Sequence, residues 1–169
     1  MFLLLENIFS VSIFMTDKIN VINTIKMPDK SKELNASISL INEKLHFNGI
    51  AGDNIPVSID YTPPLGDNLG YTSLELLLLS LSSCIGSAIL TMLRKMRKTI
   101  TGLEINSKGI RREEHPTGFK TIYLEVNLKS SDTSVAELNK VIKLSEETYC
   151  PVWAMIKGNT EVMIKCIIS

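Results

Sequence analysis

Residues 70–98 read GYTSLELLLLSLSSCIGSAILTMLRKMRK, and this stretch decides the fold. Thr72 and Glu75 have the spacing of a capping box, which predicts that a helix begins here. Apolar side chains cover nearly the whole circumference of the helix expected over Ser73–Lys98, and basic residues complement the helix dipole in its last turns. Because a helix that is apolar on all sides is buried on all sides, we expect this one to form the centre of the core.

The chain before this helix alternates apolar and polar residues in short stretches, which predicts an antiparallel meander of strands. Asn48-Gly49 has the composition of a turn between two of these strands, and Pro63-Pro64 ends the pattern. The alternating apolar residues are Ile19, Val21, Ile25, Ile38, Leu40, Leu45, Phe47, Val57, Ile59 and Tyr61.

Two further strands are expected after the helix, over residues 103–112 and 119–128, joined as a hairpin. A second capping box, Ser134 to Glu137, opens an amphipathic helix. The order of elements indicates an α+β protein with antiparallel sheets around a long buried helix. One chain of this size would struggle to surround that helix completely, so we expect a homodimer.

The C-terminal part of the chain holds a short helix and a last strand. Pro151 suits the first position of a helix that Gly158 would end. Val162, Ile164, Cys166 and Ile168 alternate as on one face of a strand.

Length and charge limit the classes of partner. The chain has 169 residues, enough for one domain with a real core, and 18 basic residues balance 18 acidic ones. No positive field therefore favours nucleic acid or an anionic membrane surface. The uncharged stretch 76–93 reaches the lower length limit of a membrane span, but its middle is small and polar, which favours a core helix. We expect residues 1–14 to be an N-terminal extension and residues 15–169 a single domain.

The three cysteines are too few and too far apart for the disulfide framework of a secreted protein. Reduced thiols in the cytoplasm fit this pattern better. His46 and His115 are isolated in the sequence, and no Cys/His cluster has the spacing of a zinc site. We therefore expect neither a metal nor a cofactor.

Two of the cysteines are candidates for chemistry. Cys84 lies in the middle of the buried helix, where a free cysteine is either a small core residue or a thiol activated by a cation from elsewhere. Cys150 directly precedes the helix led by Pro151, and the positive end of that helix dipole predicts a lowered pKa for its thiol. The alternative is that Cys150 only caps or packs. Cys166 is expected in the core.

The segment from Gly70 to Cys84 resembles the signature of the OsmC/Ohr superfamily, in which a Glu-Leu-Leu run leads to a helix cysteine. The resemblance covers roughly residues 40–168. It continues through Lys95-Met96-Arg97-Lys98, Ile110-Arg111-Arg112-Glu113-Glu114 and Tyr149-Cys150-Pro151-Val152.

This resemblance implies an intertwined homodimer that encloses the long helix, and a thiol-dependent peroxidase that acts in the stress response on organic hydroperoxides. Cys84 would then be the peroxidatic thiolate and Cys150 the resolving thiol, and an external dithiol would reduce their disulfide.

The chain departs from the peroxidase pattern at two positions that activate the first thiolate. It has no arginine before Arg94, and the residue ten positions before Cys84 is Leu74 rather than glutamate. Glu75 is one residue later, which is about 100° of helix rotation. Lys44 could replace the arginine only as a point charge. The pattern is closer to the OsmC-like branch of the superfamily than to its peroxide-resistance enzymes.

Three functions remain open at this stage. The first is a cysteine peroxidase that reduces lipophilic hydroperoxides. The second is a dimer that binds a lipophilic small molecule, or senses redox state, with weak catalysis or none. In the third, the dimer is an interaction module and its thiols are incidental.

Overall fold

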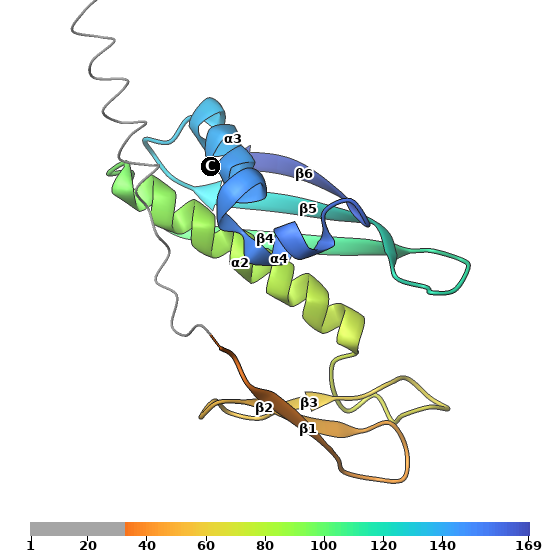
Figure 1. Cartoon of the computed structure of the whole chain (residues 1–169). Coiled ribbons are helices and arrows are strands. Elements are labelled where there is room, and N and C mark those ends of the chain that lie inside the picture. Colours follow the sequence, from red (N-terminus) through yellow and green to blue (C-terminus); the bar gives the residue numbers. More distant parts are fainter. Residues whose placement is uncertain (1–32) are drawn as a thin grey trace, which may run out of the picture.

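Residues 33–169 are described in the computed structural model (Figure 1). They form an α+β protein with a long central helix, as the sequence predicts, and the strands make two three-stranded sheets. The proposed extension over residues 1–14 and the strand expected near Ile19 lie outside the described residues.

The N-terminal sheet is an antiparallel meander in the order β1-β2-β3. Its strands are β1 (Ala36–Leu40), β2 (Phe47–Ala51) and β3 (Val57–Ile59). The turn expected at Asn48-Gly49 is wrong, because both residues lie inside β2 and pair with β1 and β3. A Cβ at Gly49 would lie 3.0 Å from the Ile59 side chain, so this glycine lets a neighbouring strand side chain approach closely.

The central helix α2 runs from Ser73 to Lys95. Its N-terminus is the predicted capping box, in which the Thr72 hydroxyl accepts from the Glu75 amide and the Glu75 carboxylate accepts from Thr72. The helix ends before the expected Lys98, since Arg97 has a positive φ of 59°.

The second sheet has the order β4-β5-β6, with β4 (Gly102–Arg111) antiparallel to β5 (Phe119–Lys129). The strand β6 (Glu161–Ile168) pairs with β5 in parallel, so this sheet is mixed. Between β5 and β6 the chain crosses one face of the sheet, and a helical crossover of this kind is what parallel neighbours require. The crossover consists of α3 (Val135–Leu144), the π-helical turn η1 (Ser145–Tyr149) and α4 (Pro151–Ile156).

The core lies between the second sheet and the helices that cover one face of it (Figure 1). Alternating side chains of β5 meet buried residues of α2 and α3 there. The fully buried large side chains include Leu81, Ile85, Ile89, Met92, Leu93, Ile122, Leu124, Val126, Leu128, Leu138 and Val141.

Two apolar surfaces stay uncovered in the single chain. Leu79 on α2 is 50% exposed, so one chain alone does not bury α2 on all sides. The N-terminal sheet lies beyond the N-terminal end of α2 (Figure 1), and one of its faces carries Ile38 and Leu40, which are 65% and 58% exposed. By length and composition α2 could cross a membrane, but its contacts with β4, α3 and α4 are those of a core helix.

Candidate functional site

The structure brings Cys84 and Cys150 together, although they are 66 positions apart in the sequence. Cys84 lies on α2 and is half-buried, and Cys150 lies between η1 and α4 with 2% of its surface exposed. Their Sγ atoms are 2.6 Å apart, and both thiols are reduced. A disulfide bond is about 2.05 Å long, so this pair needs only a small movement to close.

Cys150 owes its position to two helices that meet at this residue. It ends η1, where its backbone amide donates to the Ser145 carbonyl at 2.9 Å. It also caps the N-terminus of α4, where its Sγ accepts from the Trp153 amide at 3.3 Å. Pro151 occupies the first position of α4, as the sequence predicts, because proline has no amide hydrogen to leave unpaired there.

The expected lowering of the Cys150 pKa is wrong. Burial is the main cause that raises the pKa of the Cys150 thiol to about 12, and the contact with the Cys84 sulfur contributes to the rise. The hydrogen bond from the Trp153 amide lowers the pKa, but by less. The helix that follows has only six residues, too few for a strong dipole. Cys150 therefore keeps its proton at neutral pH and donates it toward the Cys84 sulfur.

The two charged residues considered as activators of Cys84 are engaged elsewhere. Glu75 accepts the amide and hydroxyl hydrogens of Thr72, and these bonds lower the pKa of its carboxyl group. Nine residues of helix separate it from Cys84, an axial rise of about 13.5 Å. Lys44 forms an ion pair with Asp67 in the loop after β3.

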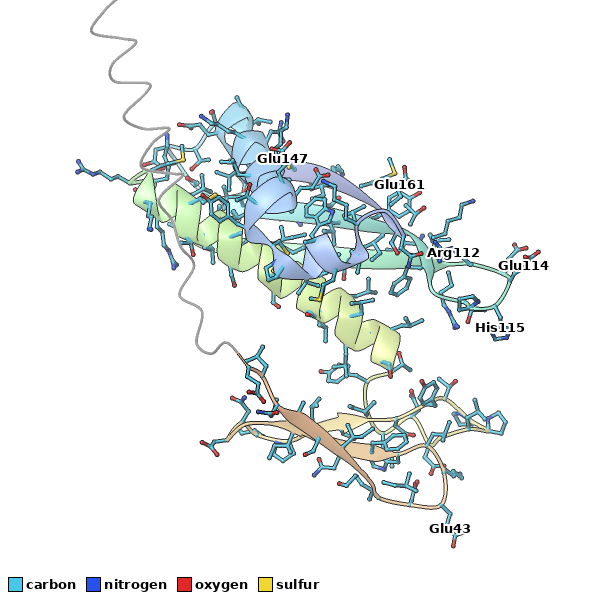
Figure 2. All side chains as sticks on the ribbon, viewed as in Figure 1. Glu43, Arg112, Glu114, His115, Glu147 and Glu161 are labelled. Carbon is cyan, nitrogen blue, oxygen red and sulfur yellow. The ribbon has the colours of Figure 1, made fainter. Side chains whose placement is uncertain are left out.

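The remaining candidates, Cys166, His46 and His115, do not lie on the elements that carry the thiol pair. Cys166 lies on β6 against the core, as expected, and burial raises the pKa of its thiol. His46 is 2.8 Å from the hydroxyl of Ser58 across the N-terminal sheet. Figure 2 shows His115 in the hairpin loop that joins β4 to β5. Within residues 33–169, no group of three potential ligands could hold a metal ion.

Sequence reasoning missed Ser145. This residue opens the π-turn η1, is fully buried, and its hydroxyl donates to the Val141 carbonyl at 2.9 Å. A serine at the end of an amphipathic helix is a common pattern, and no spacing in the sequence distinguishes a π-turn from one more turn of α-helix.

Comparisons with known proteins agree with this fold. The family model described as OsmC-like protein matches residues 66–165. Protein YhfA of Escherichia coli (strain K12) is 29% identical over 84 residues, which are 50% of this chain and 63% of that protein. The match therefore spans less than two thirds of this curated relative.

Solved structures give the same result over more of the chain. A hypothetical protein from Aquifex aeolicus superposes with a TM-score of 0.72 at 27% identity, over 82% of this chain and 98% of that one. An OsmC-like protein from Mycoplasma pneumoniae gives a TM-score of 0.68 at 22% identity, over 83% of this chain and 98% of that one. An organic hydroperoxide resistance protein OsmC from Legionella pneumophila gives a TM-score of 0.62 at 15% identity, over 82% of this chain and 98% of that one. The last two likenesses concern the fold alone.

Proposed function

The chain belongs to the OsmC-like protein family, and we propose that it is a thiol-dependent peroxidase that reduces organic hydroperoxides through Cys84 and Cys150. The observation that carries the proposal is the 2.6 Å contact between the two sulfurs. Two thiols at this distance, one half-buried and one enclosed, form a dithiol that can be oxidised and reduced without a large rearrangement.

The two thiols have different parts in the proposed reaction. The Cys84 thiolate attacks the outer peroxide oxygen, the O–O bond breaks, and the leaving alkoxide takes a proton to become an alcohol. Cys84 is then a sulfenic acid. The Cys150 sulfur attacks the Cys84 sulfur, and the hydroxyl group leaves with the Cys150 proton as water. The two thiols have supplied two electrons, and an external dithiol of the cytoplasm returns them.

The surroundings of Cys84 favour an apolar substrate. Cys84 packs against the hydrophobic core, and partly buried apolar side chains lie two helical turns before it at Leu77 and next to Cys150 in the chain at Tyr149 and Val152. A lipophilic hydroperoxide can lie against such a surface, whereas the small and strongly hydrated hydrogen peroxide gains nothing from it.

A redox sensor or small-molecule binder is the second candidate, and the engagement of Glu75 and Lys44 favours it. Neither side chain is free to stabilise a thiolate at Cys84. A dimer with this thiol pair but slow chemistry would report oxidation, or bind a lipophilic ligand, rather than turn over hydroperoxide.

We further propose that the protein works as an intertwined homodimer. The apolar face of the N-terminal sheet and the exposed part of α2 lie uncovered in the single chain. Exposed apolar surfaces on two elements of one small protein are typical of a subunit interface, and a second copy offers the same two surfaces in return.

The experiment that tests the peroxidase is intact mass after one equivalent of cumene hydroperoxide is added to the reduced protein. The wild-type chain should lose about 2 Da within seconds. Cys150→Ser should instead gain about 16 Da as the Cys84 sulfenic acid. Cys84→Ser should stay unchanged, and Cys166→Ser should behave as wild type.

The rate decides between the two candidate functions. If Cys84 reacts no faster than free cysteine, the peroxidase is refuted and the sensor or binder is favoured. Sedimentation of the reduced protein tests the dimer separately, and a monomer at micromolar concentration would contradict it.

A further inference from the structure

We propose that Ser145 is a positioning residue, and that the π-turn it opens sets Cys150 against Cys84 and determines how readily the two thiols form a disulfide. This inference deepens the proposed function, because it concerns the same thiol pair. A residue with no redox chemistry of its own would then help to determine how readily the two thiols form a disulfide.

The π-turn changes the direction in which Cys150 points. In an α-helix five residues turn through 500°, so residue 150 would point about 140° away from residue 145. In η1 the Cys150 amide instead donates to the Ser145 carbonyl five residues earlier, at 2.9 Å. That bond brings Cys150 back toward the face of Ser145, and π-turns of this kind often occur at functional sites.

The side of α3 and η1 on which Ser145 lies is the side that meets α2. Ser145 is fully buried, and both α3 and η1 contact α2. A residue returned to the same face therefore points at α2, where Cys84 is. The continuation of α3 as a plain α-helix would turn Cys150 away from that face.

Ser145 holds the turn through its side-chain hydroxyl as well as its backbone. Its carbonyl accepts the Cys150 amide, and its hydroxyl donates to the Val141 carbonyl at 2.9 Å, one turn back in α3. Serine hydroxyls that bond the carbonyl four residues earlier bend helices, which supports a change from α-helix to π-turn at this residue. An ion pair also joins Glu146 of the turn to Lys157, the residue after α4, and both side chains are well exposed, so it contributes little.

The test is the equilibrium of the thiol pair with glutathione. Oxidised glutathione takes two electrons from the pair, which gives the Cys84–Cys150 disulfide and two molecules of reduced glutathione. The ratio of oxidised to reduced protein at set glutathione concentrations measures how well the two sulfurs are held together. This readout requires no hydroperoxide.

We expect Ser145→Ala to lower this equilibrium constant about fivefold to tenfold, because one buried hydrogen bond no longer holds the turn. Ser130→Ala is the matched control, since Ser130 is also buried and hydrogen-bonded but lies between β5 and α3. It should change the constant less than twofold. Ser145→Thr and Ser145→Val then compare a hydroxyl with a methyl group at nearly constant shape. The equilibrium constant of the valine variant should be about fivefold to tenfold lower than that of the threonine variant.

Equal constants for wild type and Ser145→Ala, or equal losses for Ser145→Ala and Ser130→Ala, would overturn the positioning role. If the alanine variant does not fold, the threonine and valine pair decides in the same way. The peroxidase can fail independently, because slow reaction of Cys84 with cumene hydroperoxide leaves the glutathione equilibrium unaffected.

Discussion

Alkaline pH should destabilise this protein chiefly through one side chain, Cys150. Its pKa is raised from 9.0 to about 12 in the folded chain, chiefly by burial. The unfolded chain therefore releases the Cys150 proton near pH 9, while the folded chain keeps it up to about pH 12. The unfolded state binds fewer protons over this window, so the free energy of unfolding falls as pH rises from 9 to 12 and is unaffected by this group below pH 9.

The size of the effect follows from the same pKa difference. Each pH unit within the window costs about 1.4 kcal/mol, so the loss between pH 8 and pH 11 should be about 2 to 3 kcal/mol. That is a large share of the 5 to 15 kcal/mol typical of a folded domain.

Urea unfolding of the wild type and Cys150→Ser at pH 8, 9, 10 and 11, with excess phosphine reductant, would measure this term. The variant lacks the ionisable thiol at position 150. Between pH 8 and pH 11 its free energy of unfolding should therefore fall by about 2 to 3 kcal/mol less than that of the wild type. Cys166 is present in both proteins, and its contribution cancels in the difference. Parallel pH dependences for the two proteins would refute the reasoning, because they would show that Cys150 loses its proton equally easily in both states.

Two further predictions concern stability away from the thiols. In Gly66→Ala the new Cβ would lie 2.1 Å from a carboxylate oxygen of Asp60, so we expect a loss of about 1 to 3 kcal/mol in thermal unfolding. Gly118→Ala, with no atom nearer than 4.0 Å, should be nearly neutral, and equal losses would contradict this account. The hydrogen bond from Lys98 lowers the pKa of Glu137 to about 2, so its stabilisation is present above about pH 4.5 and disappears as pH falls toward 2. Glu137→Gln should flatten the decline in melting temperature over that range, and an unchanged decline would show that this ion pair is not its source.

The parts of the fold that the sequence predicts are those set by nearby residues. Thr72 with Glu75, and Ser134 with Glu137, are capping boxes in the structure because each box needs only four consecutive residues. The alternation in β5 likewise follows from the period of a strand with one face on the core.

Features that depend on distant parts of the chain were not predictable. Asn48-Gly49 has the composition of a turn, but two neighbouring strands hold it within β2. For the site, the sequence predicts both Cys84 and Cys150 but gives the wrong direction for the Cys150 pKa. A helix dipole can be inferred from Pro151, whereas the burial that outweighs it depends on packing with distant parts of the chain, such as Cys84 on α2, 66 residues earlier.

The place of Cys150 in the crossover between β5 and β6 also determines the order in which the site can assemble. Cys84 lies 66 positions before Cys150 in the chain, so it is synthesised first. The crossover that carries Cys150 closes only when Glu161–Ile168 pairs with β5. During synthesis Cys84 is therefore a thiol without its partner, and the pair reaches its complete surroundings only with the last strand of the described fold.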